Sequence, residues 1–273
     1  MKITLHIPLA LAGIAAMAIA ASPAVASHKK VPKAASFGGI SSQDGPVVMQ
    51  LPKGRRKATV TASWVYKCTS GDAPVYWTGF SVRVSKKGTF NVSSSRPRIF
   101  DDGSTMLESY TLSGKLTKSG ASGKLKVHST WFDASQKLTD ECDSSTFTFR
   151  LYDGNTYAGT TSDGAPVVMT VSPDRDRFTG LSLPWLADCK SGMGVWGNAN
   201  LGGPITSLGG FGGTLTKNVD FGDGTHADET QTLSGNVNAR SVVGTWQVQA
   251  NVLDSNGTST DTCDSGQVKF RLV

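Results

Sequence analysis

The chain has 273 residues, a formal net charge of +6 and 18% charged residues, and it contains 31 glycines. This composition is typical of a β-rich extracellular protein and argues against a highly charged helical protein of the cytosol. The length allows one or two domains.

The first 26 residues have the pattern of a secretory signal peptide. Met1-Lys2 form a weakly positive start, residues 7–21 are apolar, and Ala24-Val25-Ala26 supplies the small residues of a cleavage site. The alternative is an uncleaved membrane anchor, for which the apolar run is short. We expect cleavage after Ala26 and a secreted, extracellular protein without a membrane span.

A sequence pattern then occurs twice. Trp64 recurs as Trp185 and Cys142 as Cys263, in both cases 121 residues later. Self-similarity at a fixed spacing indicates a duplicated structural unit. The predicted organisation is a signal peptide (1–26), a flexible basic lead-in (27–36), a first β-domain (37–151), a short linker (152–156) and a second β-domain (157–273).

Alternating apolar and polar residues predict strands in both units. Phe147, Phe149 and Leu151 alternate with polar residues, and Val268 and Phe270 do the same near the end of the chain. This period of two is typical of antiparallel sheets with one face in water. We predict an all-β fold of two tandem homologous antiparallel domains, each a β-sandwich or a small β-barrel, since both satisfy the alternation.

Four cysteines permit three pairings in an exported protein. The repeat favours Cys68–Cys142 and Cys189–Cys263, because both pairs are 74 residues apart and occupy matched positions. A zinc site would need paired C-x-x-C spacing, which the sequence lacks. We predict one disulfide in each unit, no metal site and no cofactor.

The segment 220–224 (DFGDG) resembles the turn of PKD-type extracellular β-domains, and its acidic residues suggest calcium. The matched segment of the first unit, 99–103 (IFDDG), keeps only Phe, Asp and Gly. Those residues suit a strand end followed by an Asp-Gly turn, whereas a calcium loop needs regularly spaced ligands ending in a bidentate carboxylate. We interpret both segments as turns.

Charge is divided unevenly between the units, with +7 over residues 37–151 and −4 over residues 157–273. A basic cluster of Lys53, Arg55, Arg56 and Lys57 is a candidate patch for an anionic cell-wall polymer or extracellular glycan. The alternative is a solvated hairpin tip, and the criteria for a specific nucleic-acid partner are not met.

Six tryptophans raise the question of carbohydrate stacking. Trp64 and Trp185 are in phase with the predicted core. Trp77 and Trp196 fall in less regular segments after Cys68 and Cys189, which makes them candidates for a ligand surface. Core packing is the alternative.

The sequence contains few features of catalysis. It has no G-x-S-x-G elbow, and the histidines of the mature chain stand at unmatched positions. If Asp223, His226, Asp228 and Glu229 cluster in one pocket, an extracellular polymer-acting hydrolase with a site between the units becomes the better hypothesis. A third hypothesis is a ligand or inhibitor of a secreted protein.

The combined pattern of an aromatic-x-Gly start, Pro-Val-Val-Met, a lone Cys and Cys-Asp-Ser resembles secreted tandem β-domain proteins of actinobacteria. The resemblance covers both units and implies an exported bacterial β-domain protein, but no activity or site residues. We therefore expect a secreted non-enzymatic binding or structural module, associated with the cell envelope through its basic first unit.

Overall fold

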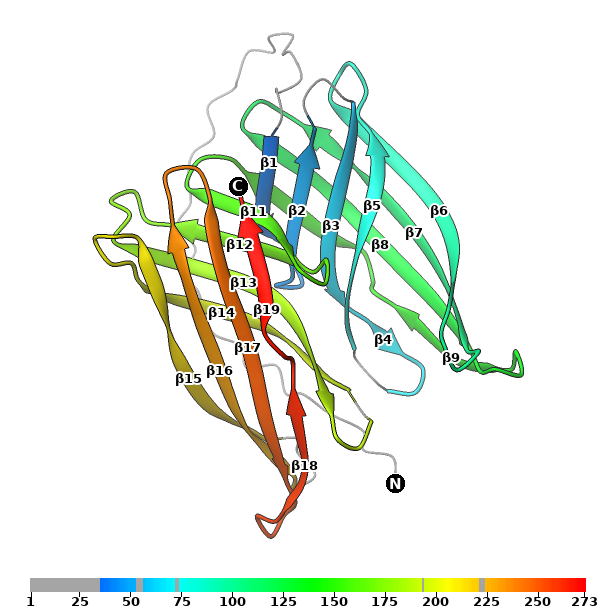
Figure 1. The fold of residues 1–273 in the computed structure, drawn as a ribbon. Helices are drawn as coiled ribbons and strands as arrows, with labels where there is room; N and C mark the ends of the chain where they lie inside the picture. Colours follow the sequence, from blue (N-terminus) through cyan, green and yellow to red (C-terminus); the bar gives the residue numbers. More distant parts are fainter. Residues whose placement is uncertain (1–34, 53–55, 72–73, 193, 221–223) are drawn as a thin grey trace.

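The fold is all-β, as expected (Figure 1). The computed structural model describes residues 35–273 except 53–55, 72–73, 193 and 221–223. The predicted signal peptide and residues 27–34 of the lead-in lie outside this part. Within it, the regular structure consists of strands.

Over the described residues, the first unit contains ten strands and the second contains nine. The strands of the first unit are β1 (Ala35–Ile40), β2 (Pro46–Leu51), β3 (Lys57–Val65), β4 (Lys67–Cys68), β5 (Val75–Arg83), β6 (Thr89–Ile99), β7 (Thr105–Leu116), β8 (Gly120–Phe132), β9 (Leu138–Asp143) and β10 (Phe147–Tyr152). Those of the second unit are β11 (Thr156–Thr161), β12 (Pro166–Val171), β13 (Arg177–Cys189), β14 (Gly194–Pro204), β15 (Gly210–Asp220), β16 (His226–Val237), β17 (Val242–Leu253), β18 (Ser259–Asp264) and β19 (Val268–Leu272).

Each unit is a single antiparallel sheet curled around its own core. The main hydrogen-bonded order is β5-β3-β2-β1-β10-β8-β7-β6 in the first unit, with β9 joining the outer half of β8. The second unit repeats it as β14-β13-β12-β11-β19-β17-β16-β15, with β18 in the place of β9. In the second unit, β18 pairs with both β17 and β13 and so closes a ring of six strands. In the first unit, β9 pairs with β8 and with β4, the two-residue strand that follows β3. Of the two predicted architectures the barrel therefore fits better.

The cores follow the predicted alternation. Along β10, Phe147, Phe149 and Leu151 are buried while the residues between them are exposed. Trp64 and Trp185 are also buried, in the cores of the first and second unit respectively. The matched tryptophans are therefore packing residues.

Each unit carries the predicted disulfide, Cys68–Cys142 and Cys189–Cys263. The paired cysteines are direct cross-strand neighbours, on β4 and β9 in the first unit and on β13 and β18 in the second. Stable disulfides form in oxidising compartments, which is where this fold is expected to mature.

A buried carboxylate recurs in both barrels, and the sequence analysis did not identify it. Glu108 on β7 is buried and pairs with its cross-strand neighbour Arg96 on β6, with 2.7 Å between Nη2 and Oε1. The matched Glu229 on β16 pairs with Lys217 on β15 at 3.2 Å. Arg96 also donates to Thr78 on β5, across the seam where, among the described residues, β5 and β6 form no ladder.

The two units pack through the outer faces of matched hairpins, β1–β2 and β11–β12. Val48, Ala158 and Val168 form a buried cluster between the sheets. Gly38 permits the close approach, because a Cβ built on it would lie 2.7 Å from the Cβ of Ala158. This contact sets the walls of the grooves described next.

Candidate functional site

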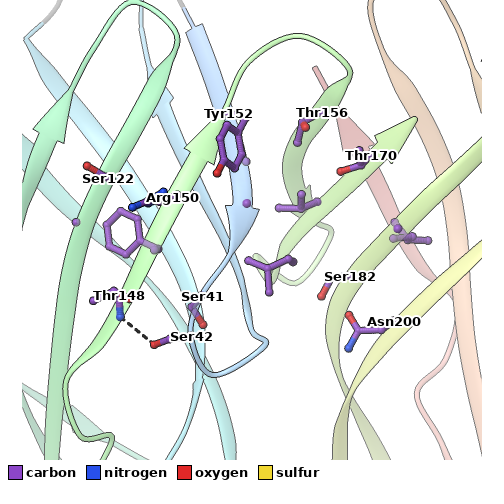
Figure 2. A pocket seen from close by; sticks show the side chains of 18 of the residues that line it. Ser41, Ser42, Ser122, Thr148, Arg150, Tyr152, Thr156, Thr170, Ser182 and Asn200 are labelled. Carbon is purple, nitrogen blue, oxygen red and sulfur yellow. Dashed lines mark hydrogen bonds between the residues drawn. The ribbon is translucent and has the colours of Figure 1, made fainter. Parts of the chain in front are cut away.

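A large groove lies between the two units. One wall carries Lys115, Lys124 and Arg150 of β7, β8 and β10, and the opposite wall includes Thr170, Ser182 and Asn200 of β12, β13 and β14. We call it the cationic groove. Its volume is about 1220 Å³. Figure 2 shows Arg150 and Tyr152 on one side of the groove and Thr170, Ser182 and Asn200 on the other.

Strand register brings the three cations together. Ser122 on β8 is opposite Arg150 on one side and opposite Lys115 on the other. Lys124 is two residues further along β8 and therefore faces the same way. Since adjacent strands lie about 4.8 Å apart, Arg150 and Lys115 are about 10 Å apart at the backbone.

The charge of this groove is unbalanced. All three cationic residues are exposed, none of them forms an ion pair within the described part of the chain, and no Asp or Glu is among the groove's described lining residues. Clustered like charges in a concave site attract ions of the opposite sign. The groove therefore favours an anionic ligand.

The opposite wall offers neutral hydrogen-bonding groups. Ser182 is 4% exposed, and its Oγ has no hydrogen-bond partner among the described residues. A buried hydroxyl without a partner costs about 1–3 kcal/mol, which a ligand or water reaching it would recover. With Thr170 and Asn200 beside it, this wall suits the hydroxyl groups of a ligand.

The cations distinguish the first unit from the second. Lys115 and Lys124 correspond by the repeat to Asn236 and Thr245, while Arg150 corresponds to Arg271. Two of the three charges are therefore dispensable for building the barrel. The three cations form no local cluster in the sequence because they are scattered along the chain, although comparing exposed strand positions between the two copies would have shown the difference.

The predicted basic patch lies elsewhere. Lys53 and Arg55 are outside the described residues, and Arg56 and Lys57 are exposed beside Arg83 at the start of β3, in a separate shallow hollow. The structure does not bring Arg56 or Lys57 into the cationic groove.

The structure brings Trp77 and Trp196 into one groove of about 770 Å³. Trp77 comes from β5 of the first unit, whereas Trp196 and its cross-strand neighbour Leu186 come from β14 and β13 of the second. Tyr76, Trp131, Arg98 and Asp163 contribute to the same surface. We call it the aromatic groove.

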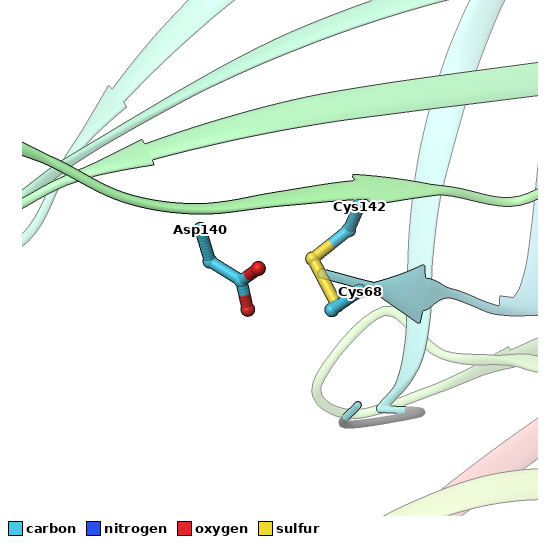
Figure 3. Close-up of side chains that lie close together, drawn as sticks. All are labelled: Cys68, Asp140 and Cys142. Atoms are coloured by element: carbon cyan, nitrogen blue, oxygen red, sulfur yellow. A yellow bond between two sulfur atoms is a disulfide. The ribbon is translucent and has the colours of Figure 1, made fainter. Parts of the chain in front are cut away.

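An aspartate stands beside each disulfide, at matched positions 140 and 261 (Figure 3 shows the first). The sulfur atoms are joined to each other and so are not available as thiolate metal ligands. Asp140 accepts hydrogen bonds from Thr69 and Ser70 at 2.6 and 2.7 Å, and Asp261 accepts from Ser191. Both aspartates therefore fix the turn beside their disulfide.

These hydrogen bonds shift the titration of both carboxyl groups. For Asp261, the hydrogen bond from Ser191 lowers the pKa below its ordinary value. For Asp140, partial burial acts to raise the pKa, but the hydrogen bonds from Thr69 and Ser70 together outweigh it and the pKa is lowered. Such carboxylates stay ionised near neutral pH and are poor proton donors for catalysis.

The residues considered for a hydrolase do not meet in either groove. Asp223 lies outside the described residues. On β16, Glu229 is buried against Lys217, while its neighbour Asp228 is exposed and accepts from Asn218. His226, Asp228 and Glu229 are absent from the described lining of both grooves.

The predicted turn after residue 99 is present in the first unit. Gly103 has a φ of +81°, and its N–H donates to the carbonyl of Phe100, while Asp102 accepts from Ser104. The matched residues 221–223 lie outside the described part. Within that part, no helix is long and apolar enough to cross a membrane.

Comparison with known proteins does not assign the chain to a family. No family model and no curated protein matches it. Among solved structures, it is similar to a protein of unknown function from the DUF3598 family of Nostoc punctiforme, with 10% identity, coverage of 88% of this chain and 94% of the other, and a TM-score of 0.16. A likeness at this TM-score supports no conclusion about fold or function.

Proposed function

We propose that the protein is a secreted, non-enzymatic binding module that holds an acidic carbohydrate polymer in the cationic groove. The observation that carries this proposal is the concentration of Lys115, Lys124 and Arg150 on one wall of a groove whose described lining contains no acidic residue. Lysine and arginine bind carboxylate and phosphate groups through charge-assisted hydrogen bonds.

The opposite wall supports a hydroxylated ligand. Ser182, Thr170 and Asn200 can donate to and accept from hydroxyl groups, and Ser182 has no competing partner among the described residues. The groove's volume exceeds the range of about 300–1,000 Å³ typical of small-molecule sites. A segment of a polymer fits these dimensions better than a single small anion.

The same lining supports the proposal of binding without cleavage. Glycoside hydrolysis ordinarily needs two carboxyl groups on either side of the scissile bond, and no carboxyl group is among the described residues of the cationic groove. The polymer is expected to keep its chain length during incubation with the protein. A fall in chain length would favour the hydrolase hypothesis instead.

The extracellular location is part of the proposal. The signal-peptide pattern, the two disulfides and the resemblance to secreted actinobacterial tandem β-domain proteins all support export. Mass spectrometry of the protein recovered from culture medium should find an N-terminus at Ser27. Recovery only from the cytoplasm with Met1 retained would contradict export.

Calorimetry on the mature chain tests the binding. Polygalacturonate and phosphorylated dextran serve as carboxylated and phosphorylated carbohydrate probes, and neutral dextran as the uncharged control. We expect binding to at least one acidic polymer, with affinity falling as salt is added, because salt screens exposed charges. The preferred polymer identifies the anionic group, while equal binding to dextran would overturn the proposal.

A charge-matched control distinguishes binding by the cations of this groove from binding by the net positive charge of the protein. In the first variant, Lys115, Lys124 and Arg150 are replaced by Gln; in the second, the exposed Lys86, Lys87 and Lys137 are replaced by Gln. Both lose the same net charge. At about 0.5 kcal/mol per exposed contact, the first should lose about tenfold in affinity and the second much less. Equal losses would show that only overall charge matters.

A further inference from the structure

The aromatic groove contains apolar side chains that stay partly exposed after the two units have packed together. The buried cluster between the units is formed by Val48, Ala158 and Val168, at the matched hairpins. In the aromatic groove, Trp77 and Trp196 are only half-buried, and Leu186 is 45% exposed. The two indoles therefore retain accessible surface in the assembled chain.

These aromatic residues are not part of the repeated framework. Trp64 is opposite Tyr76, and the matched Trp185 is opposite Gly197, so Trp77 corresponds to Asn198 and Trp196 corresponds to Val75. Each barrel is thus built without a tryptophan at the other's position. Trp77 and Trp196 line one groove only because the two units pack against each other.

Polar groups stand at the edge of the aromatic surface. Arg98 and Asp163, both exposed, bring opposite charges. Tyr76 adds a phenol whose pKa is raised by burial, although Arg98 acts in the opposite direction, so it stays a neutral donor at ordinary pH. The remaining acid, Asp140, is held by Thr69 and Ser70. With Arg98 against Asp163 and Asp140, the described lining carries one positive and two negative groups, whereas the described lining of the cationic groove is positive.

We infer that the aromatic groove is a second binding site, which takes a neutral sugar ring. A pyranose has C–H faces that pack on flat indoles and an edge of hydroxyl groups that can reach Arg98, Asp163 and Tyr76. Concave sites with aromatic walls and a few polar groups are the usual form of such sites. The described lining has no surplus of positive charge that would attract an anionic ligand.

This site is separate from the proposed polymer site. Leu186 and Trp196 stand on the same outer face of β13 and β14 as Ser182 and Asn200. The two cross-strand pairs are four residues apart, which is about 13 Å. The described linings of the two grooves share no residue. Binding at one is therefore measurable when the other has been altered.

The test uses the mature chain with cellohexaose and chitohexaose as neutral probes. Binding is measured by tryptophan fluorescence and by calorimetry. We expect at least one hexasaccharide to bind. Replacing Trp77 or Trp196 by Ala should weaken binding about tenfold or more, because it removes a large flat ring on which the sugar packs. Replacing Tyr152, an exposed aromatic of the cationic groove, should have no effect.

Two further measurements distinguish a sugar-binding site from a general apolar surface. Trp77→Leu keeps apolar surface but removes the flat ring, so retention of affinity would show an undirected apolar site and overturn the sugar assignment. In the unaltered protein, the hexasaccharide should shift the indole N–H signals of Trp77 and Trp196 and leave that of Trp64 unchanged, a result that needs no folded variant. Failure of both sugars to bind would also overturn the inference.

The variant lacking Lys115, Lys124 and Arg150 distinguishes this proposal from the previous one. It should bind the neutral hexasaccharide as the unaltered protein does while losing the acidic polymer. Loss of both ligands together would contradict two separate sites, and loss of the polymer alone is the predicted result.

Discussion

Replacing Arg96 by Met should destabilise the first barrel, because it leaves Glu108 buried without its cation. The Glu108 side chain is 2% exposed, and Arg96 supplies it with hydrogen bonds from Nε at 3.1 Å and from Nη2 at 2.7 Å. Arg96 also contacts the rings of Phe80 and Tyr110, and it bridges to Thr78 on β5. Methionine keeps part of the apolar packing and removes the charge.

The expected loss follows from the burial of the two partners. Removing one member of a fully buried pair costs about 3–5 kcal/mol. The Arg96 side chain is 40% exposed, so water already screens part of this interaction, and we expect about 2–3 kcal/mol. Lys126→Met, which breaks the far more exposed pair with Asp143, is the control and should cost less than 1 kcal/mol.

Unfolding in urea, followed by tryptophan fluorescence with the disulfides intact, measures this loss. Urea is preferred to guanidinium because the latter is a salt and screens ion pairs. The two units are fitted with separate transitions, since a two-domain chain need not unfold in one step.

A double variant tests whether the lost stability comes from leaving the Glu108 carboxylate unpaired. Arg96→Met combined with Glu108→Leu removes both charges, so most of the lost stability should return. A single variant within 0.5 kcal/mol of the unaltered protein, or a double variant less stable than the single, would refute the assignment of Glu108 as a buried, paired carboxylate.

Three other predictions concern the framework around the grooves. Asp140 and Asp261 have lowered pKa values in the fold, so the unfolded chain binds more protons. The stability that these two carboxylates contribute should be fully present above the ordinary Asp pKa of about 3.9 and be lost as the pH drops below it. Replacing both by Asn should make the fall in melting temperature from pH 7 to pH 2 less steep, the remaining fall coming from other carboxyl groups with lowered pKa values such as Asp264, and an unchanged slope would contradict this. In Gly38→Leu, the new side chain should clash with Ala158 and Val168 and separate the two units, lowering the free energy of unfolding by about 1–3 kcal/mol. An increased radius of gyration in X-ray scattering would support this, and an unchanged radius with both grooves intact would refute it. Replacing Cys68 and Cys142 by Ser should lower the free energy of unfolding of the first unit by up to about 4 kcal/mol, because the bond closes a loop across 74 residues; a change below 1 kcal/mol in urea denaturation would contradict this.

The architecture could be predicted because it depends on local alternation and on duplication. Phe147, Phe149 and Leu151 reveal the inward face of their strand from spacing alone, and matched Cys142 and Cys263 identify the disulfides. The choice between a sandwich and a barrel could not be made, because it depends on which distant strands pair. β10 pairs with both β1 and β8, and the local sequence of β10 does not indicate either partner.

The site could be predicted only in part for the same reason. Trp77 and Trp196 were identified as candidates by their irregular surroundings, but their meeting depends on contact between the units. Lys115, Lys124 and Arg150 are neighbours only through the register of three strands, whereas the contiguous run at residues 53–57 drew attention by its local density. Glu108 and Glu229 recur at matched positions, so the repeat did contain a signal for the buried pairs.

A structure of the mature chain bound to an oligogalacturonate tests the central claim most directly. We expect the carboxylates of the ligand to lie within hydrogen-bond distance of Lys115, Lys124 or Arg150, and its hydroxyl groups to reach the wall containing Ser182. An oligosaccharide bound instead at Arg56 and Lys57, with the cationic groove unoccupied, would contradict it.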